Sequence, residues 1–328
     1  MRAAIIGLGC IAEVHIAAIR ANEGEIVAVC DVDLKKAEEF SKRHSLSCPI
    51  YENYIELYEK EMPDVVHICT PHYLHCDMIC EALSRNINAF SEKPVAISYE
   101  QLDKIRAYVK SSKAQLGVSH QNRYNEPIKY ARELLSGSEI LSAVGVVAWC
   151  RDEKYYAAGE WRGKWATEGG GLVINQAIHT LDLLMDFCGM PESVIAHTHN
   201  DTLKGIIEVE DTCTALFKLA SGGRFSLLGT NGLTASLPCV AVIKSREHTV
   251  MIYNNDYLVV DGKEVKKEDT VKLIGKWEWG TGHAKIVRDF YRHIESGKPF
   301  PLGIDEAEKA IRLILALYSS NGEETKII

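Results

Sequence analysis

The sequence has no low-complexity tract and no apolar run long enough to cross a bilayer. Met1 and Arg2 lead directly into a short apolar stretch followed by glycine, which is too short for the apolar region of a secretory signal. Positive charge is not in excess, because the net charge is −8 and the pI is near 5.9. Nucleic acids and acidic membranes need a basic face, so we expect neither as a partner. We expect a cytoplasmic protein.

Regularly spaced cysteine pairs are also missing. The ten cysteines are spread singly over 328 residues, which indicates reduced thiols rather than a disulfide framework. One segment, residues 67–80, is rich in His and Cys, but it has no C-x-x-C pair and no second ligand knuckle. We therefore expect no metal site, and the role of this segment stays open.

A glycine turn follows the first apolar stretch, residues 2–6, which is typical of a buried parallel strand. Its pattern is G-x-G-x-x-A, and it opens a helix. The first glycine permits the turn, the second lets the backbone approach a pyrophosphate, and the alanine lets the helix lie against the strand. The residues expected at the cofactor are Gly7, Gly9, Cys10, Ile11 and Ala12.

An acidic residue ends the second predicted strand, residues 25–30. Asp31 lies 22 residues after Gly9, where a carboxylate accepts hydrogen bonds from the adenosine ribose hydroxyls and repels a 2′-phosphate. The alternative role, helix capping, suits Asp33 better, because Asp33 directly precedes a predicted helix over residues 34–43. The sequence therefore predicts a bound dinucleotide, and NAD rather than NADP.

Strands and helices then alternate to about residue 120, which predicts a doubly wound parallel sheet. After it come strands without intervening helices, which predict a mostly antiparallel sheet, closed by helices over about residues 281–295 and 305–321. We place a dinucleotide-binding domain at residues 1–121 and a substrate-binding and oligomerisation domain at residues 122–328. Because a broad antiparallel face is costly to leave in water, we expect a homodimer or homotetramer.

The ends of the parallel strands carry the first candidate residues, because ligands gather there in such sheets. Thr70 and Pro71 should pass close to the cofactor. Lys93 follows the strand over residues 88–91 and is placed for chemistry. His75 has two readings that the sequence leaves open, a residue facing the ligand or a local cap at a helix start.

A polar stripe marks the second half of the chain. After Gly169, Gly170 and Gly171, which allow close backbone approach, the residues Asn175, His179, Asp182 and Asp186 recur at helical spacing on one face of an otherwise apolar helix. An ordinary solvent face carries Lys, Glu or Arg, so we expect His179 to line the substrate site and Asp182 to hold its tautomer.

Aromatic and polar side chains alternate over residues 151–165. Aromatic faces beside donors and acceptors suit a polyhydroxylated ring, but the segment could equally be a loop that uses its aromatics for packing.

Taken together, these motifs resemble the Gfo/Idh/MocA oxidoreductase family, and they occur in the family's order over essentially the whole chain. The segments that carry the resemblance are residues 7–12, Glu92-Lys93-Pro94, Gln121-Asn122-Arg123-Tyr124, Trp161-Arg162-Gly163, residues 169–182 and Gly280-Thr281-Gly282-His283. The resemblance implies a Rossmann domain, an antiparallel sheet domain and a bound nicotinamide cofactor. Its substrates would be sugars, cyclitols or their derivatives.

The resemblance also implies residue roles. It makes Lys93 and His179 catalytic and adds Glu92, Asn122, Trp161 and Arg162 to the cofactor residues. The substrate residues that it implies, besides Lys93 and His179, are Arg123, Tyr124, Tyr156, Asn175 and His283. Where inositol dehydrogenases have aspartate four residues before the histidine, this sequence has Asn175, which is similar to the branch of nucleotide-sugar and glycoside 3-dehydrogenases.

The expected activity is hydride transfer between NAD(H) and a secondary alcohol or ketone of a sugar, glycoside, nucleotide sugar or cyclitol. An NAD-dependent glycosidase or lyase that passes through a transient ketone is the alternative, and a non-catalytic dinucleotide-binding protein is the third reading. The same candidate residues would serve both the dehydrogenase and the glycosidase or lyase.

Overall fold

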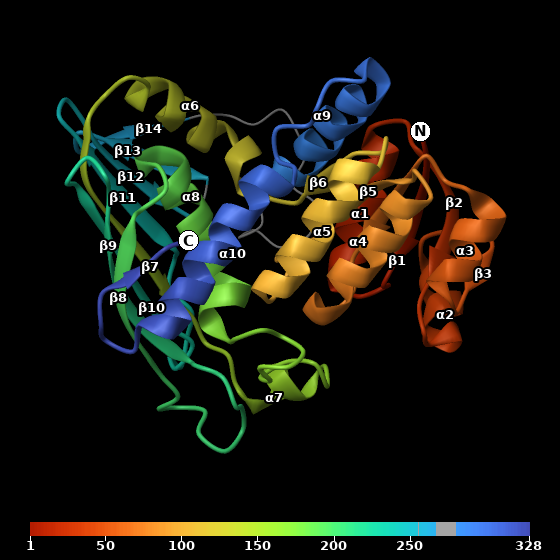
Figure 1. The fold of residues 1–328 in the computed structure, drawn as a ribbon, viewed down its shortest axis with the longest axis horizontal. Coiled ribbons are helices and arrows are strands. Elements are labelled where there is room, and N and C mark those ends of the chain that lie inside the picture. Colours follow the sequence, from red (N-terminus) through yellow and green to blue (C-terminus); the bar gives the residue numbers. More distant parts are fainter. Residues whose placement is uncertain (255, 267–279) are drawn as a thin grey trace. The chain divides into compact units, whose positions relative to one another are not determined.

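A computed structural model describes residues 1–254, 256–266 and 280–328, which form two compact units (Figure 1). The first unit contains residues 1–121 and 281–308. The second contains residues 122–254, 256–266, 280 and 309–328. None of the helices in the described part of the chain combines the length and the apolar character that crossing a bilayer requires.

The first unit is built on a sheet of six parallel strands, in the order β3-β2-β1-β4-β5-β6. These strands are β1 (Arg2–Ile6), β2 (Glu25–Cys30), β3 (Ile50–Tyr51), β4 (Val65–Ile68), β5 (Asn88–Ser91) and β6 (Leu116–Val118). The order reverses between β1 and β4, which is the switch point of a Rossmann sheet. The predicted fold of this unit is therefore confirmed, and strands 2–6, 25–30 and 88–91 have the predicted bounds.

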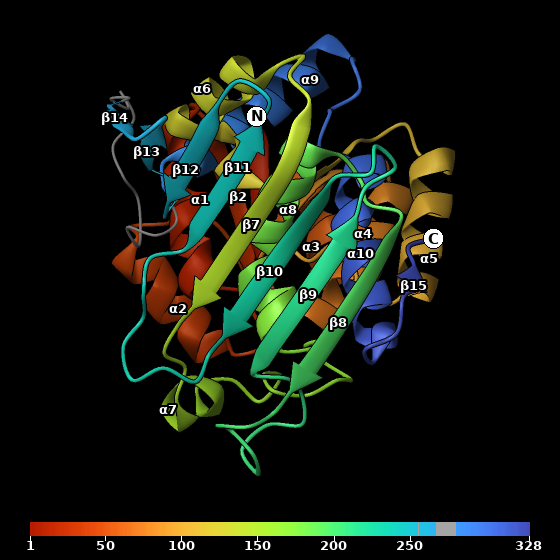
Figure 2. The ribbon, with the colours of Figure 1, turned by 90° about the vertical axis from the view of Figure 1, so that its left-hand side faces the viewer.

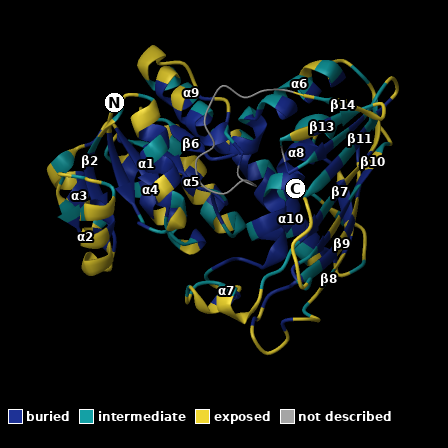
Figure 3. Cartoon of the chain, turned by 180° about the vertical axis from the view of Figure 1, so that it is seen from behind, coloured by how far each residue is buried: buried dark blue, intermediate teal, exposed yellow. Residues whose placement is uncertain are grey.

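Helices connect these strands, and their outer surfaces are exposed while the strands are buried (Figure 3). They are α1 (Cys10–Ala21), α2 (Leu34–Arg43), α3 (Tyr54–Glu61), a short turn η1 (His72–Leu74), α4 (His75–Ser84) and α5 (Tyr99–Ser111). Asp33 caps α2 by accepting from the Lys36 N–H at 3.1 Å, and Ser98 caps α5 by accepting from the Gln101 N–H at 3.3 Å. The predicted cap Asp33 is confirmed.

Helix α9 (Gly282–Ser296) belongs to the first unit, whereas the sequence placed it with the second domain. Its Phe290 ring lies 5.3 Å from the Phe90 ring of β5. A Cβ atom at Gly117 of β6 would meet Phe290 at 2.9 Å, so the glycine makes room for that ring. The helical pattern predicted an amphipathic helix correctly, but periodicity does not tell which sheet such a helix covers.

The second unit is built on a nine-stranded sheet in the order β14-β13-β12-β11-β7-β10-β9-β8-β15, seen face-on in Figure 2. The strands are β7 (Ile140–Ala148), β8 (Ser193–His199), β9 (Thr212–Lys218), β10 (Arg224–Thr230), β11 (Val240–Ser245), β12 (Thr249–Tyr253), β13 (Tyr257–Val260), β14 (Lys263–Val265) and β15 (Thr325–Lys326). Only β7 and β10 pair in parallel among these described strands, so the predicted, mostly antiparallel sheet is confirmed.

Helix α8 (Ile178–Cys188) packs on one face of this sheet. A Cβ atom at Gly145 of β7 would meet Thr180 at 2.7 Å and Leu184 at 2.9 Å, so the glycine lets the helix approach the strand. The other helical segments are η2 (Gln121–Tyr124), α6 (Glu126–Leu135), α7 (Glu153–Ala157), a π-turn η3 (Val173–Ala177) and α10 (Ile304–Ser320), whose residues from 309 onward belong to this unit.

Candidate functional site

The glycine turn of the first unit has the geometry that a phosphate cradle needs. Gly7 has φ of +85°, and a Cβ atom there would meet the Cys69 carbonyl at 2.8 Å. Gly9, the N-cap of α1, is different, because a Cβ atom there would have nothing within 4 Å. No side chain caps α1, so its first N–H groups are available to a phosphate. Gly7 shapes the turn, and Gly9 leaves space above it.

This difference predicts opposite results for two substitutions. Gly7→Ala should lower the free energy of unfolding by about 1–3 kcal/mol, because it forces a strained backbone against β4. Gly9→Ala should leave stability nearly unchanged but weaken NAD binding by about tenfold or more, the loss of about 1.4 kcal/mol. Urea unfolding and NAD titration on both variants test this. A Gly9→Ala protein that unfolds early yet binds NAD normally would contradict it.

Asp31 closes the turn from the end of β2. Its carboxylate accepts from the Leu8 N–H at 2.8 Å, from the Asp33 N–H at 3.1 Å and from Lys36 Nζ at 2.8 Å. Burial alone would raise the pKa of Asp31, but these hydrogen bonds hold it below its usual value. Asp31 is therefore a charged group braced on the turn, and Lys36 is a nearby cation that the sequence analysis did not consider.

His75 joins two strand-end loops. Its side chain is completely buried, with Nδ1 2.7 Å from the Pro94 carbonyl and Nε2 2.8 Å from the Thr70 carbonyl. Burial lowers the pKa of His75, and the two carbonyls oppose that shift. It thus fastens the segment after Lys93, which is joined to Pro94 by a cis peptide, to the Thr70-Pro71 segment. Neither reading of this histidine included such a cross-link.

A buried chain of hydrogen bonds begins at Glu92, directly before Lys93. Glu92 Oε1 lies 3.0 Å from His15 Nε2, the two Nδ1 atoms of His15 and His67 are 2.8 Å apart, and His67 Nε2 lies 2.8 Å from the Tyr291 hydroxyl. With both histidines neutral, every contact is satisfied when Tyr291 donates to His67, His67 to His15, and His15 to the Glu92 carboxylate. We call these four residues the Glu92 chain.

The Glu92 chain keeps a carboxylate charged in the interior. Burial would raise the pKa of Glu92, but the hydrogen bond from His15 and the positive charge of Lys93 lower it. His283, at the start of α9, lies beside this chain, with its ring 6.5 Å from that of His15. Burial lowers the pKa of His283 to about 4, so it is neutral at pH 7. The predicted substrate residue His283 is therefore a buried neighbour of Glu92.

The sequence analysis missed His15, His67 and Tyr291. His15 follows Ile11 by four residues, so helical spacing alone places it on the buried face of α1. His67 interrupts the apolar strand β4, and a buried polar group needs a partner. Both signals were present. No local sequence pattern identifies Tyr291, because its hydrogen-bond partner, His67, lies 224 residues away in the sequence.

In the second unit, buried carboxylates hold the segment that carries Asn175 and His179. Glu210 accepts from the N–H groups of Gly171 and Val173, each at 2.9 Å, and from the Tyr318 hydroxyl at 2.9 Å. Asn175 donates to Glu168 at 2.5 Å. Burial raises the pKa of both Glu168 and Glu210 to about 7. These two acids were not predicted, and they fix the backbone before His179, whose own side chain is half-buried.

The glycine run before this segment serves packing. A Cβ atom at Gly170, which has φ of +145°, would lie 2.0 Å from the Tyr318 hydroxyl, and one at Gly171 would lie 2.0 Å from the Glu210 carbonyl oxygen. The close backbone approach that the sequence predicted is therefore made by protein atoms.

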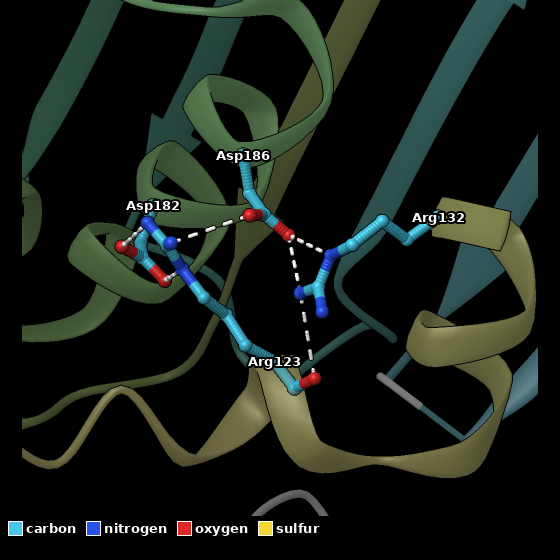
Figure 4. Close-up of polar contacts among 4 residues, drawn as sticks. All are labelled: Arg123, Arg132, Asp182 and Asp186. Carbon is cyan, nitrogen blue, oxygen red and sulfur yellow. Dashed lines mark hydrogen bonds and ion pairs between the residues drawn. The ribbon is translucent and has the colours of Figure 1, made fainter. Parts of the chain in front are cut away.

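The last two residues of the predicted polar stripe, Asp182 and Asp186, form ion pairs with arginines (Figure 4). Asp182 is 2% exposed and accepts from Arg123 Nε at 2.8 Å and Nη2 at 2.7 Å. Asp186 accepts from Arg123 Nη1 at 3.2 Å and from Arg132 at 2.5 Å. Arg123 thus makes buried ion pairs with the carboxylates, which differs from the expected contacts with substrate. Asp182 holds this arginine, and its expected role at the His179 tautomer stays a prediction.

Two neighbouring tyrosines on α7, Tyr155 and the predicted substrate residue Tyr156, differ in burial. Tyr156 is buried in a small core with Leu203, Ile207 and Val209, and its hydroxyl accepts from Asn231 at 3.2 Å. Tyr155 is half-buried, and its hydroxyl accepts from Gln176 at 3.1 Å and from Asn175 at 3.4 Å. Successive residues of a helix point about 100° apart, so only one of the two can face the core.

The remaining predicted residues lie on loops and turns. Asn122 is 3% exposed, Tyr124 is half-buried with Lys129 Nζ 5.6 Å from its ring centroid, and both belong to η2. Trp161 and Arg162 are half-buried in the second unit. The ten cysteines are free thiols. Within residues 1–254, 256–266 and 280–328, no group of three His, Cys, Asp or Glu side chains is arranged to hold a metal.

Comparisons with known proteins agree with this architecture. Residues 1–120 match the profile of the Gfo/Idh/MocA oxidoreductase family with its NAD-binding Rossmann fold, and residues 128–246 match the C-terminal domain of the same family. D-glucoside 3-dehydrogenase of Escherichia coli is 24% identical over 100% of this chain and 97% of that enzyme.

Two further relatives differ in the fraction of the chain that the match covers. 2,7-anhydro-N-acetylneuraminate hydratase of Mediterraneibacter gnavus is 28% identical, but the match covers 58% of this chain and half (50%) of that enzyme's length. The WlbA dehydrogenase of Bordetella pertussis, crystallised with NADH and UDP-GlcNAcA, superposes with a TM-score of 0.87 at 24% identity, covering 100% of this chain and 99% of that one, and shows that the fold is shared.

Proposed function

This chain belongs to the Gfo/Idh/MocA family of NAD-dependent oxidoreductases, and from that premise we propose that it oxidises a secondary alcohol of a sugar, glycoside, nucleotide sugar or cyclitol, or reduces the corresponding ketone. The glycine turn carries the proposal, because Gly9 leaves open space in front of an uncapped helix N-terminus and Asp31 stands charged beside it. The residues Gly7, Gly9, Cys10, Ile11, Ala12 and Asp31 would hold the dinucleotide.

Two side chains would perform the proton and charge chemistry. NAD supplies the hydride acceptor when it is bound. His179 would take the hydroxyl proton, because an unperturbed histidine side chain titrates close to neutral pH. Lys93 would donate a hydrogen bond to the oxygen as negative charge develops on it. Asn175 would orient the substrate hydroxyls one helical turn before His179, and the ionised Glu92 would keep Lys93 positively charged.

Turnover with a panel of substrates tests the activity. NADH absorbance should rise when the protein is mixed with NAD and one member of a set of cyclitols, free sugars, glycosides and nucleotide sugars. If no alcohol in the panel leads to NADH formation and no corresponding ketone leads to NADH consumption, the proposal is contradicted.

A second candidate function is a redox-assisted elimination or hydration, in which NAD oxidises a ring carbon transiently and the hydride returns. It is favoured by the hydratase among the relatives. Product formed without net NADH supports this function, whereas NADH released in proportion to product supports the dehydrogenase.

Cofactor preference should depend on Asp31 and Lys36 in opposite directions. We expect NAD to bind more tightly than NADP, because the Asp31 carboxylate repels a 2′-phosphate. Asp31→Asn should narrow the difference in Kd, and Lys36→Met should widen it, because the lysine offsets part of that repulsion. Titration of both cofactors into the three proteins decides this. If Lys36→Met instead narrows the preference for NAD over NADP, Lys36 does not offset the repulsion between Asp31 and the 2′-phosphate.

We also propose that the protein is a homodimer or homotetramer that associates through the open face of the second sheet, and that it works in the cytoplasm, where its thiols stay reduced. The strand register aligns Ile195, Leu216, Ser226 and Val144 in one row across β8, β9, β10 and β7, and the three apolar members, Ile195, Leu216 and Val144, are 40%, 44% and 41% exposed. A largely apolar row of this kind on a broad sheet marks an association surface.

Changing one residue of this row should dissociate the oligomer. Leu216→Lys places a charge in the proposed interface and should shift light scattering toward the monomer mass at micromolar concentration. Ile206 is the matched control, because it is also 44% exposed but lies on a loop outside the sheet. If the unchanged protein is already a monomer, the proposed association is excluded.

A further inference from the structure

Two arginines and three aromatic rings form a continuous stack in the second unit. Arg151 Cζ lies 4.7 Å from the ring centroid of Trp149 and 4.9 Å from that of Tyr155. Arg162 Cζ lies 4.8 Å from the centroid of the same Tyr155 ring and 5.0 Å from that of Trp161. We call these five residues the arginine–aromatic ladder. Because both guanidinium groups contact one ring, they lie close to each other.

The two guanidinium groups retain hydrogen-bonding capacity. The Nε atoms of Arg151 and Arg162 are buried and have no hydrogen-bond partner in the described part of the chain. Arg151 makes one side-chain bond, from Nη1 to the Cys150 carbonyl at 2.9 Å. Neither arginine forms an ion pair with a described carboxylate. Stacking on aromatic rings stabilises a cation but leaves its in-plane N–H donors unbonded.

The buried acid that interacts with Arg162 does not neutralise this pair. Glu168 interacts electrostatically with Arg162, but its two carboxylate oxygens accept from the Gly163 N–H and from Asn175, each at 2.5 Å. Burial raises the pKa of Glu168 to about 7, so a large fraction of it is uncharged at neutral pH. The ladder therefore holds two cations whose Nε donors are unbonded, and forked guanidinium donors match carboxylate and phosphate oxygens.

The centre of the ladder is joined to the segment that precedes His179. The Tyr155 hydroxyl accepts from Gln176 and Asn175, and Asn175 lies one helical turn before His179. A group bound by the ladder would therefore lie beside the residues that should orient the substrate. The aromatic faces add apolar surface of the kind that the C–H face of a sugar ring covers.

We propose that Arg151 and Arg162 bind an anionic group of the substrate, a carboxylate or a phosphate, so that the preferred substrates are acidic sugars or sugar phosphates, including nucleotide sugars. This inference rests on the proposed function, because it defines the substrate class of the same site. The pyrophosphate of the dinucleotide is another source of the same chemistry. The substrate is favoured because the glycine turn of the first unit already offers a phosphate cradle.

A pair of sugars that differ in charge alone tests the ladder directly. Methyl β-D-glucuronide and methyl β-D-glucoside share their ring and differ by a carboxylate in place of a hydroxymethyl group. In the presence of NAD, we expect the glucuronide to bind at least tenfold more tightly, measured by quenching of tryptophan fluorescence. Added salt should reduce this advantage, because it screens partly exposed charges.

Arginine substitutions should remove the advantage. Arg151→Gln and Arg162→Gln should each weaken glucuronide binding roughly ten- to a hundredfold and change glucoside binding little, as expected for a lost charge-assisted hydrogen bond. Arg162→Lys keeps the charge without the forked donors and should give an intermediate loss. Arg246→Gln is the matched control, because it removes the same charge from an exposed ion pair with Glu139 in the same unit.

The outcomes separate the possible sources of the anion. If Arg162→Gln raises the Kd of NAD and leaves glucuronide binding intact, the ladder binds the cofactor pyrophosphate and the proposal is overturned. Equal binding of the two sugars by the unchanged protein also overturns it. Should the Gln variants fail to fold, the salt dependence and Arg162→Lys decide. Tight glucuronide binding without NADH formation from any sugar would instead refute the proposed function and leave the anion site standing.

Discussion

His179→Ala is expected to lower kcat roughly 10²- to 10⁴-fold, the usual contribution of a positioned general base. Activity should recover in part at higher pH, because hydroxide from solvent can replace the missing base. The loss should not come from misfolding. Glu210 accepts from the backbone N–H groups of Gly171 and Val173, and Glu168 accepts from the Asn175 side chain, so these contacts do not use the histidine.

Lys93→Ala should lower kcat by a similar factor but should not recover at high pH. Its loss removes a hydrogen-bond donor from the developing oxyanion, and a change in bulk pH does not restore a fixed donor. Both variants should bind NAD normally, since Gly9 and Asp31 are unchanged. The pH–rate profiles of kcat for the three proteins are the measurement. Recovery of Lys93→Ala alone would exchange the two roles and make the lysine the base.

Asp182→Ala should be among the most destabilising single changes in the chain. It leaves the Arg123 guanidinium, which is 7% exposed, without its two shortest ion-pair contacts. Breaking a buried pair from one side costs about 3–5 kcal/mol of unfolding free energy, because the remaining charge stays in the interior. Urea unfolding measures this cost.

A double variant separates the cost of breaking the Arg123–Asp182 pair from one side from the value of the whole pair. Arg123→Met with Asp182→Leu removes both charges and should recover most of the lost stability, while Asp186 keeps Arg132 as its partner. The exposed pair of Arg246 and Glu139 is the control, and Glu139→Ala should cost about 0–1 kcal/mol. A double variant no more stable than Asp182→Ala would show that the aspartate matters through packing.

Local patterns predicted the elements well. The bounds of β2 and α2 follow from an apolar run and from the cap Asp33, and the cofactor turn follows from the spacing of its glycines and Asp31. Each of these signals lies within about thirty residues of sequence, so the chain carries it in one segment. The prediction of an NAD-binding Rossmann sheet is confirmed for this reason.

Long-range contacts account for the differences. Arg123 and Asp182 are 59 residues apart, and His67 and Tyr291 are 224 apart. Periodicity identified His179 and Asp182 as polar positions on one helix but could not say which of them meets an arginine from another segment. Likewise, the composition of residues 151–165 fitted both a binding surface and a packed loop, whereas only the turn of α7 decides that Tyr156 enters the small core and Tyr155 does not.

The return of α9 to the first unit has a consequence for synthesis of the protein on the ribosome. The Rossmann core lacks Phe290 and Tyr291 when residue 121 emerges, so the Phe90 ring and the Glu92 chain have no partner from α9 until residues 281–308 follow. At roughly 5–20 residues per second, that wait lasts on the order of 10–40 s. The second sheet is complete in sequence earlier, apart from β15. The nascent first unit is therefore the part of the chain that most needs protection from aggregation and proteolysis.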